Sequence, residues 1–115
     1  MEKYIAILKN YKDFLQFMHW NTGKDYASHL LFERLMGEID DLLDRLVEVY
    51  MGIYDERMNF KKFISNDKTD IIDVRQYIRD AKAEFEKLMM TMPESEQNVI
   101  VDILEMFDRH LYLLW

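Results

Sequence analysis

The sequence predicts an all-α protein built as a bundle of four long helices. Only 3 of its 115 residues are glycine and 1 is proline, which leaves little material for turns. A β-sandwich of this size would need a turn signal about every 8–12 residues. Hydrophobic residues make up 50% of the chain, and they recur at the i, i+3, i+4 and i+7 spacing of a helical face. This length suits one core, so we expect a single domain over residues 1–115.

The first two helices are predicted over residues 4–18 and 26–50. The apolar face of the first consists of Tyr4, Ile7, Leu8, Tyr11, Phe14, Leu15 and Met18, and that of the second consists of Leu31, Leu35, Ile39, Leu42, Leu46 and Tyr50. The segment 21–25 carries Asn, Thr, Gly and Asp, which indicates a turn followed by a helix cap. At ~1.5 Å per residue the second helix is roughly 40 Å long, a length typical of bundles and coiled coils. Gly52 is expected to end it.

Two further long helices are predicted in the second half of the chain, after a long connection. A short helix is predicted within residues 54–66, a third long helix over 71–90 with Thr69 or Asp70 as its cap, and a fourth over 94–113 after the break at Pro93. The connection over residues 51–70 is the only long one, so it can return the chain from one end of the bundle to the other. That feature distinguishes a ferritin-like four-helix bundle, with a short extra helix between helices 2 and 3, from a simple up-and-down one.

Composition and charge exclude several classes of protein. The absence of cysteine rules out disulfides, thiolate metal sites and a cysteine nucleophile. Without a leader-like amino terminus or a run of ~18 apolar residues, we expect a cytoplasmic protein with no membrane contact. The net charge is −7, and the few clustered lysines, such as Lys3, Lys9 and Lys12, are diluted by acids. This argues against DNA binding and fits a protein that gathers cations.

Four potential metal ligands share one stripe of the second helix. With His29 at zero and ~100° per residue, Glu33 falls near 40°, Asp44 near 60° and Glu48 near 100°. A histidine four residues before a carboxylate, followed by a second pair at i and i+4, favours metal binding, because such side chains can converge on one ion. The alternative is a solvated acidic face, as is usual for exposed carboxylates.

The spacing of the two pairs suggests that the site is shared between two chains. His29 and Asp44 are fifteen residues apart, hence ~22 Å along one helix, and cannot hold the same ion. Two copies packed antiparallel about a two-fold axis would bring the first pair of one chain to the second pair of the other. Gly37 lies near the midpoint, where two helices could approach closely. Nitrogen and oxygen ligands suit iron, with zinc or manganese as competing occupants.

Two residues at the end of the first helix join this group. The turn over residues 21–25 folds the second helix back, so that His19 can lie near His29. Trp20 would then place an oxidisable aromatic ring next to the metal, and we predict it as the catalytic residue. Alternatively, both residues only close the end of the core. His110 has no partner at ligand spacing and is expected to be structural or exposed.

The motif resembles that of a known family. The sequence His19-Trp20-Asn21, followed by Tyr26, His29, Phe32, Glu33, Asp44 and Glu48, resembles the signature of the Dps family of ferritin-like mini-ferritins over roughly residues 14–50. The resemblance implies a ferroxidase site formed by His19, His29 and Glu33 of one subunit and Asp44 and Glu48 of its neighbour. It also implies a hollow shell, typically of twelve subunits, that stores ferric mineral.

Iron chemistry is therefore the expected function. We expect Fe(II) binding and oxidation by hydrogen peroxide or dioxygen, which makes the protein an oxidoreductase (a ferroxidase) that sequesters iron and detoxifies peroxide as a homodimer or a larger homo-oligomer. Two alternatives remain open. The chain could be a helical interaction or scaffold protein with a vestigial site, or a divalent-metal binder without redox turnover.

Overall fold

The computed structural model describes residues 1–55, 57 and 71–115. In this part all regular structure is helical, with α1 (Glu2–Trp20), α2 (Tyr26–Tyr54), α3 (Val74–Thr91), a 3₁₀ turn η1 (Glu94–Glu96) and α4 (Asn98–Leu113). The prediction of an all-α fold with four long helices is confirmed. The short helix predicted within residues 54–66 falls mostly outside the described residues. None of the described helices is both long and apolar enough to cross a membrane.

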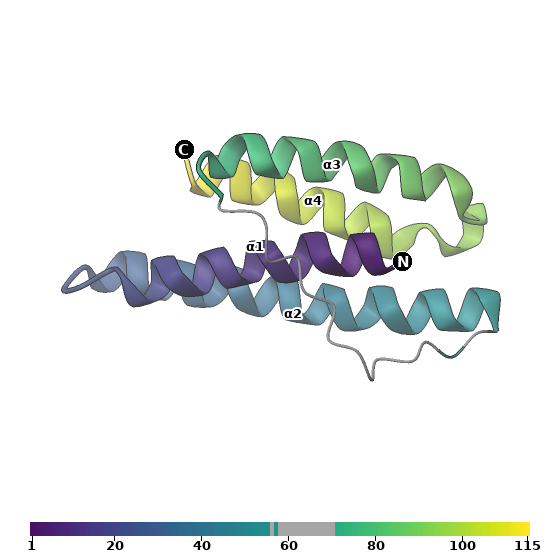
Figure 1. Cartoon of the computed structure of the whole chain (residues 1–115), viewed down its shortest axis with the longest axis horizontal. Helices are drawn as coiled ribbons and strands as arrows, with labels where there is room; N and C mark the ends of the chain where they lie inside the picture. Colours follow the sequence, from purple (N-terminus) through teal and green to yellow (C-terminus); the bar gives the residue numbers. More distant parts are fainter. Residues whose placement is uncertain (56, 58–70) are drawn as a thin grey trace.

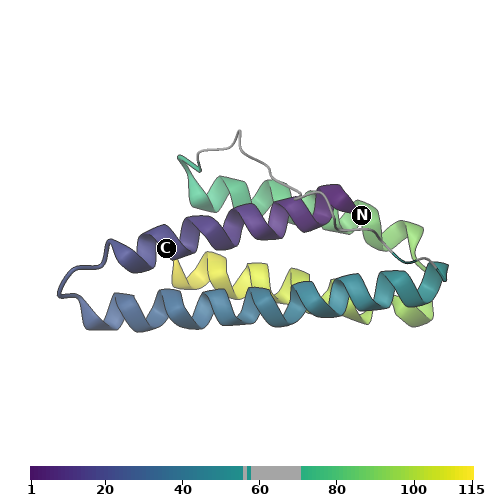
Figure 2. The same ribbon diagram turned by 60° about the horizontal axis from the view of Figure 1, so that its bottom comes forward.

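The four helices are arranged as two antiparallel pairs. Helix α1 packs mainly on α2 and α3 on α4, and the pairs meet chiefly through α2 and α4. Figures 1 and 2 show the two pairs side by side, with the turn between α1 and α2 projecting beyond the near ends of α3 and α4. The reason is length: α2 has 29 residues, whereas α3 has 18 and α4 has 16. The far end of the α1–α2 hairpin therefore has no helix of the other pair over it.

Several predicted helix boundaries differ from the structure, among them the end of α2 and the start of α3. Helix α2 continues through Gly52 to Tyr54 and ends at Asp55, which adopts the left-handed conformation with φ 47°. Helix α3 starts three residues later than predicted, because the Asp73 carboxylate accepts the backbone N–H of Gln76 at 3.1 Å and caps the first turn. The predicted caps of α3, Thr69 and Asp70, lie outside the described residues.

The start of the fourth helix is also displaced. Residues 94–96 form the 3₁₀ turn η1, and α4 begins only at Asn98. The side-chain amide of Gln97 donates to the carbonyl oxygens of Met89 and Met92, each at 3.0 Å. The Met89 carbonyl also accepts the backbone N–H of Met92 at 3.2 Å, and together these bonds hold the turn between the two helices.

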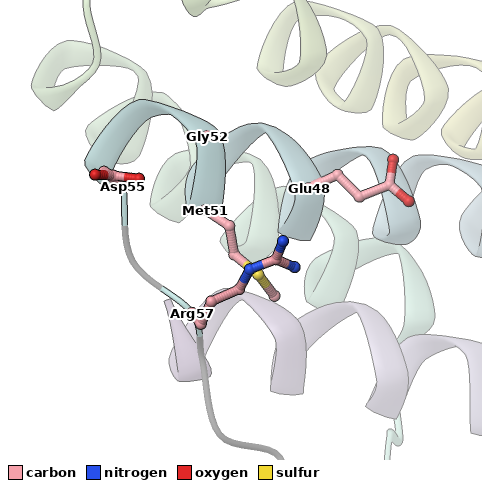
Figure 3. A pocket seen from close by; sticks show the side chains of 5 residues that line it. All are labelled: Glu48, Met51, Gly52, Asp55 and Arg57. Atoms are coloured by element: carbon pink, nitrogen blue, oxygen red, sulfur yellow. The ribbon is translucent and has the colours of Figure 1, made fainter.

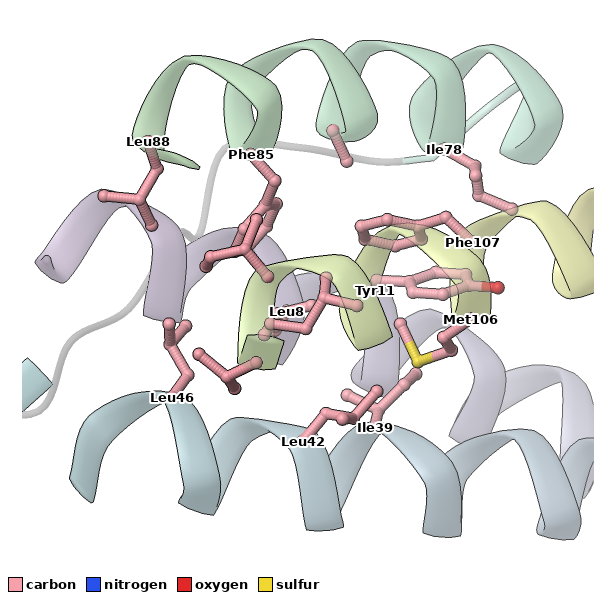
Figure 4. Close-up of a cluster of buried hydrophobic side chains, with 14 of the residues drawn as sticks. Leu8, Tyr11, Ile39, Leu42, Leu46, Ile78, Phe85, Leu88, Met106 and Phe107 are labelled. Carbon is pink, nitrogen blue, oxygen red and sulfur yellow. The ribbon is translucent and has the colours of Figure 1, made fainter. Parts of the chain in front are cut away.

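One apolar core joins all four helices. Its buried members are Leu8, Tyr11, Leu15, Leu35, Ile39, Leu42, Leu46, Ile78, Ala81, Phe85, Leu88, Met92, Val99, Ile100, Ile103, Met106 and Phe107. Figure 4 shows side chains from α1, α2, α3 and α4 meeting at its centre, where the rings of Phe85 and Phe107 lie 5.9 Å apart. Each large side chain that is fully buried contributes about 1.5–3 kcal/mol to folding. All the members from α1 and α2 belong to the apolar faces predicted from the sequence.

Candidate metal centre

A tight turn places His19 and His29 opposite each other at the projecting end of the hairpin. Gly23 takes φ +57°, a conformation that glycine adopts without strain, and the backbone N–H of Asp25 donates to the carbonyl oxygen of Thr22 at 3.0 Å. Asp25 then caps α2, as predicted, by accepting the backbone N–H of Ser28 at 3.1 Å. The last turn of α1 and the first turn of α2 therefore face each other, and each carries one histidine.

The structure brings three of the five predicted ligands together. One ligand atom each from His19, His29 and Glu33 lies within 4.8 Å of the other two, and among the described residues this is the one such group of histidine and acidic side chains. The two Nε2 atoms of the histidines are 3.1 Å apart, and the ring centroids are 3.9 Å apart. Glu33 reaches the same point because it lies one helical turn after His29. Both histidines are half-buried, whereas Glu33 is exposed.

The hydroxyl group of Thr22 sets the proton positions at the histidine pair. It donates to the carbonyl oxygen of His19 at 2.9 Å, so its oxygen is left to accept the Nδ1–H of His29 across a long contact of 3.5 Å. His29 then presents a lone pair at Nε2, and the Nε2–H of His19 donates to it. Metal-binding histidines commonly give their second N–H to a neighbouring oxygen in this way. Nε2 of His29 thus carries a lone pair, and a metal ion would displace the Nε2 proton of His19 to bind both rings.

Trp20 lies at this end of the hairpin but is turned toward a different neighbour. Its ring packs edge-on against Phe17 at 5.7 Å, and its side chain is 63% exposed. Tyr26 is exposed as well, and its ring stacks parallel to that of His29 with 6.3 Å between centroids. A catalytic role for Trp20 stays a prediction. The alternative, in which Trp20 closes the end of the core, does not agree with its exposure.

Asp44 and Glu48 do not join the triad within one chain. Both are exposed on α2, three to four turns beyond Glu33. Glu48 lines a shallow pocket of about 320 Å³ near the end of α2, together with Met51, Gly52, Asp55 and Arg57 (Figure 3). The surface between the triad and this pocket is open at Gly37, where an added Cβ would meet no atom within 4 Å. A second chain is needed to bring these carboxylates to the histidines.

The third histidine is placed quite differently. His110 is fully buried in α4, and both of its ring nitrogens have partners: Nδ1 lies 2.7 Å from the hydroxyl oxygen of Tyr11, and Nε2 lies 2.8 Å from Oε2 of Glu38. The sequence analysis missed this network, because its three members lie on three helices and far apart in the sequence. The signal that could have found it is the helical spacing of His110, which is seven residues after Ile103 and three after Phe107 on the buried face.

Comparison with known proteins identifies a family for which no activity is recorded. A model of the family DUF5856, described as a family of unknown function, matches residues 19–114. The chain belongs to this family. The chain is also similar to a protein from Enterobacteria phage T4, described as an uncharacterized 14.6 kDa protein in the mobD–ri intergenic region. That protein is 30% identical over 115 residues, covering 98% of this chain and 86% of the phage protein. No solved structure matches the chain.

Membership of DUF5856 corrects the resemblance drawn from the sequence. The family model spans most of the chain, including every predicted ligand, and it is not that of the Dps family, so the assignment to the Dps family is wrong. The twelve-subunit shell and the ferric mineral were implied by that resemblance alone and lose their support with it. The ligand geometry at His19, His29 and Glu33 does not depend on it.

Proposed function

We propose that this DUF5856 protein binds Fe(II) at His19, His29 and Glu33 and promotes its oxidation by hydrogen peroxide, at a site that a second copy completes. The observation that carries the proposal is the convergence of three ligand atoms within 4.8 Å from two helices. We further infer that the architecture is that of a ferritin-like four-helix bundle. In such bundles the metal ligands project from helices that face each other. A cytoplasmic setting stays a prediction.

The ligand types favour iron or manganese over zinc. The 3.1 Å between the two Nε2 atoms is the length of a hydrogen bond between the rings, and it is short enough for both nitrogens to bind one ion through metal–nitrogen bonds of about 2.1 Å. Structural zinc sites in proteins are almost always four-coordinate. Fe(II) and Mn(II) accept six ligands of mixed nitrogen and oxygen type, so a site that also gains Asp44 and Glu48 suits them better.

An octahedral ion has six ligands, and the triad supplies only three of them. The missing ligands are the argument for a second copy of the chain. The unused carboxylates of the stripe, Asp44 and Glu48, are exposed, and neither has an ion-pair partner in the part of the chain that the structure describes. Antiparallel packing of two α2 helices across Gly37 would bring these oxygens to the triad of the other chain. The open space above Gly37 supports such an approach.

The proposed reaction requires the site to bind Fe(II) and to stabilise Fe(III). Neutral imidazole and ionised carboxylate bind Fe(II), so affinity falls as the pH falls and protons compete for the ligands. Carboxylates favour the higher charge of Fe(III) more than that of Fe(II), and they lower the cost of losing the electron. Reduction of one peroxide molecule to water consumes two electrons and two protons. One electron comes from the bound Fe(II), and the other comes from a second Fe(II) or from the protein.

The experiment that tests the proposal is oxidation of Fe(II) by peroxide under anaerobic conditions, followed through the near-ultraviolet absorbance of Fe(III). Wild-type protein should oxidise Fe(II) saturably and faster than buffer. His29→Ala and Asp44→Ala should each lose this activity. Rates equal to buffer for the wild type would overturn the proposal, and saturable metal binding without oxidation would identify a non-redox metal binder.

Mixing the two inactive variants tests the shared site directly. A dimer of one His29→Ala chain and one Asp44→Ala chain contains one site with all ligands intact and one site that lacks both residues. An equal mixture that has exchanged subunits should therefore recover about a quarter of wild-type activity, since half of the dimers are mixed and half of their sites are intact. A site contained within one chain would give no recovery.

A further inference from the structure

A chain of two hydrogen bonds runs from the centre of the core to the surface. Tyr11 of α1 and His110 of α4 are fully buried, and Glu38 of α2 has a side chain that is 22% exposed. The Tyr11 hydroxyl lies 2.7 Å from Nδ1 of His110, and Nε2 of His110 lies 2.8 Å from Oε2 of Glu38. Three helices thus contribute one titratable group each to a single linear arrangement.

The charges fix the direction of each hydrogen bond. Burial works to raise the pKa of Glu38, but the hydrogen bond from His110 and the charge of Arg109 outweigh it, so the pKa lies below its usual value and the carboxylate is ionised. Burial lowers the pKa of His110, against the effect of Glu38, so the imidazole is neutral. Its single N–H must then lie at Nε2 and donate to Glu38. The Tyr11 hydroxyl consequently donates to the lone pair at Nδ1.

This is the arrangement that allows a buried phenol to lose an electron reversibly. An oxidised phenol is strongly acidic, and in a dry core its proton needs a base within hydrogen-bond reach, about 2.6–3.2 Å. The Nδ1 atom of His110 is such a base. The imidazolium that forms lies against the Glu38 carboxylate, which stabilises it as the carboxylate of a serine-protease triad stabilises its histidine. On reduction the proton returns along the same bond.

Tyr77 is a second tyrosine close to Tyr11, but its hydroxyl group has different hydrogen-bond partners. Its ring centroid is 6.2 Å from that of Tyr11, and burial raises the pKa of both phenols. The Tyr77 hydroxyl, however, donates to the backbone carbonyl of Ile7 at 2.8 Å and accepts from the side-chain amide of Asn10 at 3.3 Å. A peptide carbonyl is not a base near neutral pH, so Tyr77 has no group to receive its proton.

We propose that Tyr11 is a redox-active tyrosine that supplies the second electron when peroxide oxidises a single bound Fe(II), with His110 as the acceptor of its proton. The proposal rests on the proposed function for the source of the oxidant. The balanced step converts Fe(II), the Tyr11 phenol, neutral His110, one hydrogen peroxide and two solvent protons into Fe(III), the neutral tyrosyl radical, the imidazolium and two waters. Both oxygen atoms of the peroxide leave as water.

The second electron matters because the triad of one chain converges on one ion. One Fe(II) gives peroxide one electron, and a one-electron reduction releases hydroxyl radical. Tyr11 lies eight residues before His19 on the same helix, hence about 12 Å along α1. Leu15, fully buried, lies between the two positions. The electron therefore passes through packed protein rather than solvent, and the radical forms where water cannot reach it.

The first arm of the test omits iron, so that its outcome does not depend on the proposed function. The full chain is oxidised by a soluble one-electron oxidant generated with a light flash, and radicals are observed by electron paramagnetic resonance. Site-specific incorporation of 3-fluorotyrosine at position 11 should add fluorine splitting to the long-lived radical. Tyr77→Phe should retain this radical, and Tyr11→Phe should lose it. His110→Gln, which keeps a hydrogen-bonding side chain but removes the base, should shorten its lifetime.

The fluorinated residue keeps this arm decisive even if Tyr11→Phe fails to fold, because it preserves the hydroxyl group and the packing. A long-lived radical without fluorine splitting, or one that His110→Gln leaves unchanged, would overturn the inference.

The second arm adds Fe(II) to saturation of the triad and then one equivalent of peroxide. The same fluorine-split radical should appear together with Fe(III), and a spin trap should detect more hydroxyl radical from Tyr11→Phe than from wild type or Tyr77→Phe. Iron oxidation with equal trapped hydroxyl radical in all three proteins would overturn the role in peroxide reduction. If the first arm succeeds and Fe(II) is not oxidised at all, the proposed function fails, whereas Tyr11 stands as the redox-active residue.

Discussion

The histidine pair at the projecting hairpin and the buried histidine in the core show two uses of the same side chain. Around His19 and His29 the hydrogen bonds are few and long, and the neighbouring Glu33 is exposed. His110, in contrast, is fully buried, and both of its ring nitrogens are held by groups on other helices at 2.7 and 2.8 Å. The hairpin histidines could still bind a ligand through their ring nitrogens, whereas both ring nitrogens of His110 already have close partners.

The difference shows that the number of hydrogen-bond partners, rather than residue type, separates a histidine that could bind a metal from one that is fixed in the core. Both histidines lie next to the turn between α1 and α2, at the end of the hairpin that projects beyond α3 and α4 (Figures 1 and 2), where no helix of the other pair supplies partners. The core surrounds His110 with α1 and α2 and leaves no unpaired nitrogen. Substitutions at the hairpin should therefore change binding, and substitutions at His110 should change stability.

The largest effect is expected from His110→Ala. It leaves a cavity in the core and removes the partners of Tyr11 and Glu38, so the free energy of unfolding should fall by about 3–5 kcal/mol. His19→Ala, at the half-buried pair, should change it by about 0.5 kcal/mol or less. Urea denaturation measures both. Equal losses in the two variants would contradict the comparison.

The pH dependence of stability should separate the two kinds of histidine. Burial lowers the pKa of His110 below its ordinary 6.5 in the folded state, so the unfolded chain binds this proton first. Stability is then highest above that pH and falls as the pH drops below about 6.5, by up to about 1.4 kcal/mol per pH unit. His110→Gln should flatten this part of the profile, although its stability at neutral pH is lower. An unchanged slope would show that His110 is not the group that titrates.

A smaller effect is expected at the caps of α2 and α3. Asp25 and Asp73 each accept the backbone N–H of the third residue after them at 3.1 Å, so either change to Ala should cost about 1 kcal/mol of stability. Asp25→Ala should also weaken Fe(II) binding, because His29 lies in the first turn that Asp25 caps. Asp73→Ala should not. Calorimetric titration measures affinity, and equal affinities in the two variants would remove the link between the turn and the site.

The smallest effect is expected from Gly37→Ala. Alanine favours a helix over glycine by about 1 kcal/mol, and the added Cβ meets open space, so the isolated chain should become slightly more stable. Self-association should weaken if α2 packs against its copy at this position. Gly52→Ala, on the same helix outside the acidic stripe, should give the stability gain alone. Sedimentation velocity compares the two, and an unaltered dimer in Gly37→Ala would contradict packing across this glycine.

Helical periodicity predicted the fold well because most core positions repeat at the spacing of one face. It found Leu8, Tyr11 and Leu15 on α1, and the same spacing would also have placed His110 on the buried face of α4. Helix ends were less predictable, since the cap of α3 depends on which of several neighbouring acids and threonines reaches the backbone. Asp73 does so, and it was not among the predicted caps.

The convergence of His19, His29 and Glu33 was predictable for a similar reason. A short turn places His19 opposite His29, and the i, i+4 rule adds Glu33. Family membership was not predictable from the same motif, because ligands at helical spacing can recur in unrelated bundles. The Tyr11–His110–Glu38 network depends on how three helices pack, and no local pattern encodes it.

The most direct test of the central claim is an anaerobic calorimetric titration of Fe(II) into wild-type protein, His29→Ala and His110→Gln. We expect saturable binding of about one ion per chain in the wild type, since each two-fold pair of chains would hold two sites. Binding should be lost in His29→Ala and retained in the folded fraction of His110→Gln. Wild-type protein that shows no plateau, or binding that survives in His29→Ala, would contradict the claim that the open histidine pair holds the metal.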